Sequence, residues 1–368
     1  MSSITLDGVT KDFGAFTAVK DMSLEIKEGE FVALLGPSGC GKTTTMNMIA
    51  GFEEPSNGRI LFDGKDLSRT RIQDRNIGFV FQNYAIFTHL TVWKNLSYGL
   101  EVKGVSKSEI ERRVRAMADR MSISHRLESP ASSLSVNEMQ KLAIGRSAIV
   151  EPRIFLLDEP LSNLDAAFRA YMRAELKVLQ HEFGQTMVYV THDQIEAMSL
   201  ADRIAIIDKG KLMQYGTPLE VYNNPQNRFV ANFVGSPRMN LMDGELRQEG
   251  GELRLMMQGG ATIPVKGALR KAFEASSGVH AGTLAIRPQD IHFDPARNAE
   301  GAELRGTVEV VERVGPKRLV HLQVLATTFL AFDEQDQFSV GDDVSFYLPS
   351  DKSLAFDLES GHRLGGIR

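Results

Sequence analysis

The sequence is short of several residue types, and each shortage excludes a class of protein. Among 368 residues there is one cysteine, Cys40. A disulfide within the chain is therefore impossible, which favours a reducing compartment such as the cytoplasm. No apolar run approaches the roughly 18 residues that a membrane-spanning helix needs. Residues 1–7 have neither the basic segment nor the apolar stretch of a signal peptide. We therefore do not expect a secreted, disulfide-stabilised or membrane-spanning protein.

Positive charge is not in excess either. Lys and Arg number 42 and Asp and Glu number 47, which gives a net charge of −5. Binding to nucleic acid through overall charge is therefore not expected. Hydrophobic residues make up 42% of the chain and charged residues 24%, as in ordinary globular proteins. At about 150 residues a domain, the length indicates about two or three domains.

The two parts of the chain have different hydrophobic patterns. In the first, short apolar runs alternate with helix-length segments, which is typical of a parallel α/β sheet. These runs are residues 31–35, 154–157, 187–190 and 203–207. The pattern changes near residues 233–237. Beyond them apolar residues alternate with period two, as at Val320, Leu322 and Val324. This alternation predicts a small β-barrel or sandwich of about 130 residues.

A nucleotide-binding motif follows the first apolar run. Residues 36–43 read Gly-Pro-Ser-Gly-Cys-Gly-Lys-Thr and match the pattern G-x-x-x-x-G-K-[ST] between a predicted strand and a predicted helix. Its glycines let backbone N–H groups surround phosphates, and the helix N-terminus adds partial positive charge. Lys42 would reach the β- and γ-phosphates, and the Thr43 hydroxyl would bind Mg²⁺. The alternative is a chance glycine-rich turn. The candidate ATP-binding residues are Gly36, Ser38, Gly39, Cys40, Gly41, Lys42, Thr43 and Thr44.

Two carboxylates follow the apolar run 154–157. Asp158 stands where the predicted strand ends, at the edge of an open α/β sheet where ligands bind, and it suits Mg²⁺. Glu159 suits a base that polarises the attacking water. A strand followed by Asp-Glu is also common as a solvated turn, but the phosphate-binding motif on the same chain favours the functional interpretation.

With these motifs the chain resembles the ATPase subunits of ABC transporters over residues 1–235. With its second part included, it is similar over essentially its whole length to the subunits that energise bacterial carbohydrate importers of the maltose and glycerol-3-phosphate types. Residues 235–240 and 286–290 resemble landmarks of their C-terminal domain. The resemblance implies an α/β P-loop ABC-type nucleotide-binding domain at residues 1–235, with an inserted helical subdomain at residues 86–150. It also implies an all-β, OB-like (TOBE) domain at residues 236–368, with a regulatory or dimerising role.

The resemblance assigns roles to further residues. Phe13 would stack on adenine, although a core phenylalanine is the alternative. Gln82 would contact Mg²⁺ or water and respond to the membrane subunit. Asp165 would communicate across a dimer, and His192 would contact the γ-phosphate. Glu159 and His192 are thus the expected catalytic pair. The expected metal ligands are Thr43, Gln82 and Asp158.

One motif departs from the family pattern. Family members carry Leu-Ser-Gly-Gly-Gln, which contacts the γ-phosphate held by the opposite subunit, whereas residues 134–138 read Leu-Ser-Val-Asn-Glu. Ser135 is retained as a nucleotide contact, but Val136 resists the dihedrals that glycine adopts. Glu138 brings negative charge toward a polyanion, at a cost of roughly 3–4 kcal/mol for charges about 4–5 Å apart at an effective dielectric near 20. Ser135 and Glu138 also have the spacing of a capping box, so a plain helix cap is the competing interpretation.

A smaller departure lies at Thr88, where family members commonly have proline. The resemblance implies that residues 83–92 line the groove for a coupling helix of the membrane subunit. Phe87 and Leu90 would supply apolar contacts there, and core packing is the alternative for both.

The resemblance implies an ATP- and Mg²⁺-dependent motor of a bacterial-type importer, peripheral at the cytoplasmic face of the inner membrane. The expected solute is a carbohydrate, a polyol or a glycerol-type molecule. The expected partners are two transmembrane permease subunits, indirectly a periplasmic or extracellular solute-binding protein, and a second ATPase; nucleic acid is not expected. Because Lys42, Glu159 and His192 are intact, the favoured second ATPase is a non-identical subunit that carries the Leu-Ser-Gly-Gly-Gln motif, the family's signature, rather than a second copy of this chain. The alternatives are a mainly non-hydrolytic regulatory subunit, an importer ATPase for polyamine or iron, and a soluble ABC protein of repair or translation.

Overall fold

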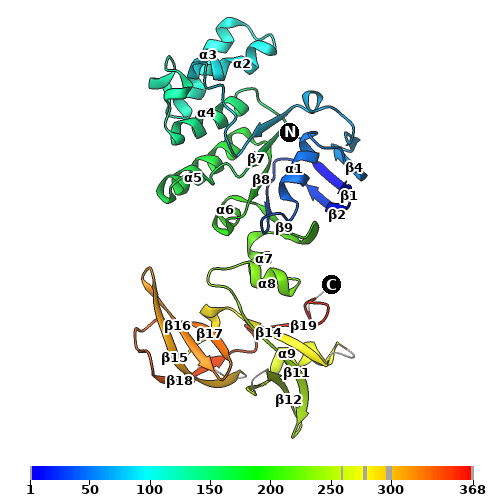
Figure 1. Cartoon of the computed structure of the whole chain (residues 1–368), viewed down its shortest axis with the longest axis vertical. Helices are drawn as coiled ribbons and strands as arrows, with labels where there is room; N and C mark the ends of the chain where they lie inside the picture. The colour runs from blue at the N-terminus through cyan, green and yellow to red at the C-terminus, as the bar shows by residue number, and fades with distance from the viewer. Residues whose placement is uncertain (1, 258–259, 277–279, 296–300, 366–368) are drawn as a thin grey trace. The chain divides into compact units, whose positions relative to one another are not determined.

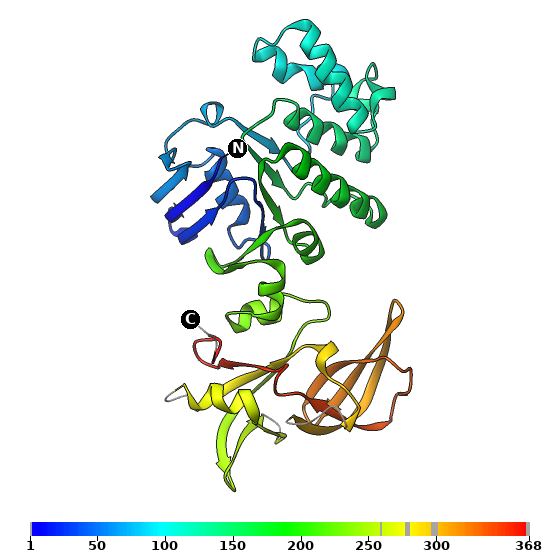
Figure 2. The same ribbon diagram turned by 180° about the vertical axis from the view of Figure 1, so that it is seen from behind.

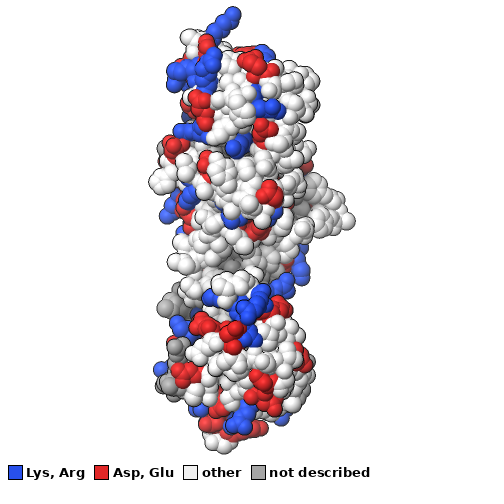
Figure 3. Space-filling model, turned by 90° about the vertical axis from the view of Figure 1, so that its left-hand side faces the viewer, with Lys and Arg blue, Asp and Glu red and all other residues white. Residues whose placement is uncertain are grey.

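The computed structural model describes residues 2–257, 260–276, 280–295 and 301–365 (Figure 1). The chain divides into two compact units, Met1–Pro218 and Leu219–Arg368, and each has a hydrophobic core of its own. On the face drawn in Figure 3, basic and acidic side chains are intermixed in both units rather than gathered by sign.

The first unit is built on a six-stranded sheet with strand order β10-β9-β3-β8-β7-β6. Its strands are β3 (Phe31–Leu35), β6 (Ile77–Val80), β7 (Ile154–Asp158), β8 (Thr186–Thr191), β9 (Arg203–Asp208) and β10 (Lys211–Gly216). β10 pairs antiparallel with β9, and the other pairs are parallel. Every residue of β3 and β8 is buried. Strands of a parallel sheet are buried on both faces, which explains the near-continuous apolar runs that predict them.

A second, antiparallel sheet of order β2-β1-β4-β5 shares the core of this unit. Its strands are β1 (Ile4–Phe13), β2 (Phe16–Ile26), β4 (Asn57–Phe62) and β5 (Lys65–Asp66). The helices beside the six-stranded sheet are α1 (Lys42–Ala50), α5 (Ala166–Phe183) and α6 (Gln194–Leu200). α1 contacts β7 and β8, and α6 contacts β3 and β8. The carboxyl ends of the parallel strands therefore carry the loops that lead into these helices.

A helical layer is inserted between β6 and β7 (Figure 2). It consists of α2 (Val92–Val102), α3 (Lys107–Arg120) and α4 (Val136–Ala148), with the short 3₁₀ turns η2 (Ser124–Arg126) and η3 (Ala131–Ser133) between α3 and α4. A further 3₁₀ turn, η1 (Ile72–Asp74), precedes β6. Thr91 caps α2 and Ser106 caps α3 through their side-chain oxygens. In α3, Ile110, Val114 and Met117 are buried at helical spacing, so the amphipathic pattern faces the layer's interior.

The second unit begins with the short helices α7 (Pro218–Asn223) and α8 (Arg228–Phe233). Two antiparallel sheets follow, of order β13-β12-β11-β14-β19 and β17-β16-β15-β18, and residues from both contribute to one core. The strands and remaining helical segments are β11 (Asn240–Glu249), β12 (Glu252–Met257), β13 (Thr262–Pro264), α9 (Gly267–Glu274), β14 (Ala281–Ile286), η4 (Pro288–Asp290), β15 (Ala302–Val314), β16 (Lys317–Val324), β17 (Thr327–Asp333), β18 (Asp343–Leu348) and β19 (Leu354–Asp357). The predicted fold class, an α/β nucleotide-binding unit followed by an all-β domain, is confirmed.

Candidate functional site

The glycine-rich loop between β3 and α1 has the geometry of a phosphate cradle. A Cβ on Gly36 would overlap the carbonyl of Ile207, and Gly41 has φ +105° with the Ala18 carbonyl 2.5 Å from the place of a Cβ. Both positions therefore require glycine. Gly41 is also the N-cap of α1 and supplies no side-chain cap. The first N–H groups of the helix consequently point into the loop as donors for an anion.

Lys42 lies at the centre of this loop. Its side chain is buried, and Nζ donates to the carbonyls of Gly36 at 2.9 Å and Pro37 at 2.8 Å. Cys40 is buried nearby, with Sγ 3.8 Å from Nζ. Burial raises the pKa of the Cys40 thiol, so the thiol is neutral and leaves the ammonium charge available for phosphate.

Thr43 and Asp158 form the next part of the site. The Thr43 hydroxyl donates to Asp158 Oδ1 at 3.3 Å, which joins the first turn of α1 to the end of β7. Burial, and after it the charge of Glu159, raises the pKa of Asp158. Two adjacent carboxylates of this kind gain from a nearby cation, and hydroxyl and carboxylate oxygens are what Mg²⁺ prefers. The residues present thus fit a magnesium ion bound together with phosphate.

Glu159 is the centre of a second group of side chains. Its backbone adopts φ +44°, a conformation that costs a non-glycine residue of order 1–3 kcal/mol. Its N–H donates to the Val190 carbonyl at 3.0 Å, which fixes this turn against β8. Its Oε1 lies 3.1 Å from His192 Nδ1, and Gln82 Nε2 donates to its Oε2 at 3.5 Å. The fold therefore brings together three predicted site residues from the ends of β6, β7 and β8.

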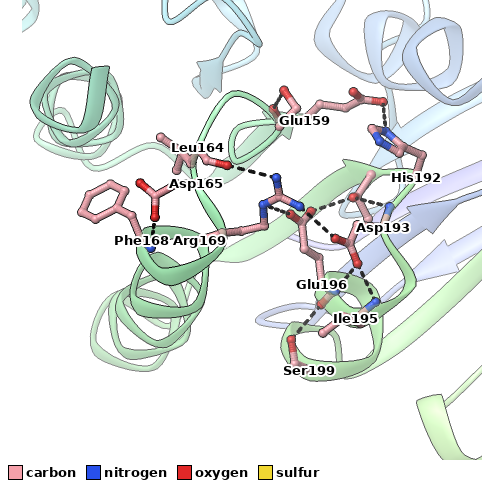
Figure 4. A network of polar contacts seen from close by, with 12 residues as sticks. Glu159, Leu164, Asp165, Phe168, Arg169, His192, Asp193, Ile195, Glu196 and Ser199 are labelled. Carbon is pink, nitrogen blue, oxygen red and sulfur yellow. Dashed lines mark hydrogen bonds and ion pairs between the residues drawn. The ribbon is translucent and has the colours of Figure 1, made fainter. Parts of the chain in front are cut away.

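The loop that carries Asp165 is tied to the loop that carries His192 by Arg169 of α5 (Figure 4). Arg169 Nη2 donates to the Leu164 carbonyl at 3.0 Å and Nη1 donates to Asp193 Oδ2 at 3.3 Å. Asp165 is the N-cap of α5 and accepts from the N–H of Phe168 at 2.9 Å. A structural role of Asp165 is thereby explained, while its predicted contact across a dimer stays a prediction.

Glu196 of α6 supports the loop that carries His192 and Asp193. It is 3% exposed and accepts from Tyr189 Oη at 2.8 Å and Thr191 Oγ1 at 2.6 Å. Thr191 Oγ1 in turn accepts from the N–H of Asp193 at 2.9 Å. Burial raises the pKa of Glu196. Sequence reasoning did not single out Arg169 or Glu196. Arg169 bonds to loops that follow two different strands, which no local pattern marks, whereas the partners of Glu196, Tyr189 and Thr191, are close to it in the chain.

Ser135 and Glu138 form the capping box that their spacing predicts, at the N-terminus of α4. Glu138 Oε2 accepts from both the N–H and the hydroxyl of Ser135 at 2.8 Å. Glu138 Oε1 lies 3.3 Å from Arg126 Nε and 3.7 Å from His125 Nε2. The hydrogen bond from the Ser135 backbone, followed by desolvation and these neighbours, leaves the pKa of Glu138 lowered overall. Glu138 is thus ionised and held by its own helix end, and Arg126 provides a counter-charge that sequence reasoning missed.

Phe13 ends β1 at the tip of a hairpin. It is 48% exposed, and Phe16 across the turn is 62% exposed. Lys11 Nζ lies 4.9 Å from the centre of the Phe13 ring. The alternative of a core phenylalanine is therefore wrong. β2 leaves this hairpin and passes its Ala18 carbonyl against Gly41 of the phosphate loop, so the exposed rings precede the strand that touches the cradle.

The segment with Thr88 is held by Asn95. The Phe87 N–H donates to Asn95 Oδ1 at 2.9 Å and the Phe87 carbonyl accepts from Asn95 Nδ2 at 3.0 Å. Phe87 is half-buried beneath the guanidinium of Arg146, 4.8 Å from its ring centre. Thr88 is exposed.

Within the described residues, the helices are all too short or too polar to cross a membrane.

Comparison with known proteins agrees with this site. The family model for ABC transporters matches residues 19–162, and that for the TOBE domain matches residues 284–356. The trehalose/maltose import ATP-binding protein MalK of Thermococcus litoralis is 42% identical over 98% of this chain and 99% of its own length. The xylose/arabinose import ATP-binding protein XacK of Haloferax volcanii is 42% identical over 99% of this chain and 96% of its own.

Solved structures give the same picture for the nucleotide-binding unit. CbiO1 of Clostridium perfringens, part of an ABC transporter complex, has a TM-score of 0.56 and 30% identity over 59% of this chain and 89% of its own. The ATP-binding cassette MJ0796, in a post-hydrolysis dimer with ADP and Pi, has a TM-score of 0.53 and 30% identity over 58% of this chain and 98% of its own. The chain therefore belongs to the family of ABC transporter ATPases.

Proposed function

We propose that this ATPase is the motor subunit of an importer for a carbohydrate, a polyol or a glycerol-type solute. The proposal is supported by full-length similarity to proteins whose names describe import of trehalose and maltose, and of xylose and arabinose. In this proposal the chain lies at the cytoplasmic face of the membrane and works with two permease subunits. A solute-binding protein on the other side delivers the solute to them.

The proposed reaction is hydrolysis of the γ-phosphate of ATP by water. The loop amides and Lys42 bind the phosphates, and Glu159 accepts a proton from the attacking water. The water oxygen bonds to the γ-phosphorus while the bond to the β–γ bridging oxygen breaks, giving ADP and inorganic phosphate. His192 orients the Glu159 carboxylate through their 3.1 Å contact. Thr43, Asp158 and Gln82 would hold Mg²⁺, which when bound neutralises charge on the phosphates.

We further propose that the second ATPase of the complex is a non-identical subunit. The observation that carries this proposal is the capping box of Ser135 and Glu138, because the hydroxyl and N–H of Ser135 are already bonded to a carboxylate. The same helix end would have to face the nucleotide of the opposite subunit. The Lys42, Glu159 and His192 site has no such defect, so it would hydrolyse ATP when an intact signature from another chain covers it.

The experiment is ATP hydrolysis by the complex reconstituted in lipid vesicles with its solute-binding protein. Glu159→Gln should lower turnover by about 10²–10⁴, the usual contribution of a general base. Glu128→Gln, which changes an exposed carboxylate of the helical layer, is the matched control and should leave turnover unchanged. Maltose, sorbitol or glycerol should stimulate turnover. If the Glu159→Gln complex kept full activity, ATP would be hydrolysed at the site of the other subunit, and this chain would be the mainly non-hydrolytic regulatory subunit of the alternative. Stimulation of turnover by putrescine or ferric iron alone would contradict the proposed class of solute.

A further inference from the structure

Arg169, in the first turn of α5, bonds to the two loops whose side chains form the expected catalytic pair (Figure 4). Its Nη2 donates to the Leu164 carbonyl at 3.0 Å, and its Nη1 donates to Asp193 Oδ2 at 3.3 Å. A guanidinium is planar and holds its donors in a fixed fork. The two bonds together therefore fix where one loop lies relative to the other.

The first of these loops begins at Glu159 and ends at Leu164. The N–H and the hydroxyl of Ser162 donate to the Glu159 carbonyl at 3.2 Å and 3.0 Å. The N–H of Leu164 donates to the Leu161 carbonyl at 3.3 Å, and both leucine side chains are buried. The loop is thus a compact turn with bonds across it, so a bond that holds the Leu164 carbonyl also restrains the backbone of Glu159.

The second loop carries His192, whose side chain is 57% exposed, so packing alone does not fix the ring. The strand β8 ends at Thr191, which is anchored through its hydroxyl to the buried Glu196 at 2.6 Å. After the histidine, Asp193 caps α6 with Oδ1 and leaves Oδ2 to Arg169. Arg169 consequently restrains the residue that directly follows His192.

These contacts form a closed ring. It runs from Glu159 along its loop to Leu164, through the guanidinium of Arg169 to Asp193 and His192, and returns across the 3.1 Å between His192 Nδ1 and Glu159 Oε1. Loss of the guanidinium opens the ring on the side opposite to this last contact. The histidine loop is then held to the first loop only by the exposed imidazole itself.

We propose that Arg169 is a positioning residue for ATP hydrolysis, which holds His192 where it orients the Glu159 carboxylate. The inference rests on the roles proposed above for Glu159 and His192. A displacement of about 1 Å at a reacting group can lower a rate about 10²-fold. Arg169 acts through these two side chains, so its loss should change the rate of hydrolysis and leave the binding of ATP as it is.

The test is ATP turnover of the complex reconstituted with its solute-binding protein, measured over a range of ATP concentrations. Arg169→Gln should lower kcat about tenfold to a hundredfold with KM for ATP nearly unchanged. Asp193→Asn keeps a good N-cap for α6 but removes the charged partner of Arg169, and it should lower kcat similarly. The double variant should lose no more than the weaker single variant, because both changes break the same contact. Calorimetry of ATP binding to the full chain should give equal affinities.

Lys177→Gln is the matched control. Lys177 stands on the same helix and makes the same kind of clamp, since its Nζ donates to the Leu200 carbonyl at 3.0 Å and to Asp202 Oδ1 at 2.9 Å. Its side chain is 36% exposed, against 29% for Arg169. Both substitutions should lower the midpoint of urea unfolding, but Lys177→Gln should leave kcat unchanged. If Arg169→Gln does not fold, Asp193→Asn carries the test.

Glu159→Gln is measured beside these variants to separate the inference from the proposed function. If Glu159→Gln lowers turnover while Arg169→Gln and Asp193→Asn do not, the positioning role is wrong and the catalytic role of Glu159 stands. An equal loss of kcat in Lys177→Gln, or weaker ATP binding with kcat unchanged in Arg169→Gln, would also overturn the inference. Unchanged turnover of Glu159→Gln would contradict the proposed function, and the inference with it.

Discussion

Glu138→Gln is the substitution that most sharply separates charge from shape in the altered signature. A glutamine still offers an oxygen to the Ser135 N–H, so the helix cap is retained. The substitution removes the ion pair with Arg126, whose side chain is 28% exposed, against 24% for Glu138. A pair this exposed contributes about 0–1 kcal/mol, so the free energy of unfolding should hardly change.

The effect on nucleotide-dependent pairing should be larger. A carboxylate about 4.5 Å from a phosphate charge costs about 4 kcal/mol at an effective dielectric near 20, and a guanidinium about 8 Å from that phosphate returns about 2 kcal/mol. The net cost of about 2 kcal/mol corresponds to roughly 30-fold in affinity for each composite site. Because a symmetric dimer has two such sites, Glu138→Gln should strengthen ATP-dependent self-association by up to the square of that factor.

Sedimentation of the full chain with Mg-ATP is the assay, with Glu159→Gln present in every sample to slow hydrolysis. Arg126→Gln should shift association in the opposite direction, because it leaves the Glu138 charge without its partner. Glu109→Gln is the matched control, since Glu109 is also an acid in the first turn of a helix and pairs with Arg112 and Arg113. Unchanged or weaker association of the Glu138→Gln chain would refute the charge argument.

Three further predictions follow from the site. Lys42→Ala should weaken binding of ATP, measured by calorimetry, by at least about tenfold, because a charge-assisted hydrogen bond of about 1.5–3 kcal/mol is removed. Arg169→Gln should destabilise the fold by about 1 kcal/mol, measured by urea unfolding, since it removes hydrogen bonds to two part-buried acceptors, the Leu164 carbonyl and the Asp193 carboxylate. Burial raises the pKa of Glu196, so the folded state holds its proton to higher pH than the unfolded state. Stability should therefore fall as pH rises from the unfolded pKa through the folded one, and Glu196→Gln should remove this slope in pH-dependent denaturation.

Local features of the site are readable in the sequence because they depend on neighbouring residues. The loop at 36–43, the strand before Asp158 and the capping box of Ser135 all follow from short-range backbone geometry. Contacts between distant segments are not readable in this way. Arg126 of η2 pairs with Glu138 of α4 because the chain between them folds so that η2 lies beside the start of α4. Arg169 bonds to Leu164 and Asp193, which lie in loops that follow two different strands.

The all-β unit shows the same limit. Period-two alternation predicts strands such as β16 but does not specify which strands pair. The two sheets depend on pairings such as β14 with β19 and β15 with β18. These pairings join strands far apart in the chain, so local pattern carries little information about them.

The central claim, an asymmetric motor, is tested most directly by native mass spectrometry of the complex recovered through an affinity tag on this chain. We predict one copy of this chain, one different ATPase with an intact signature, and two permease subunits. Two identical copies of this chain on the permease subunits, with full ATP turnover, would contradict the account, because residues 134–138 would then form a working signature despite the charge of Glu138.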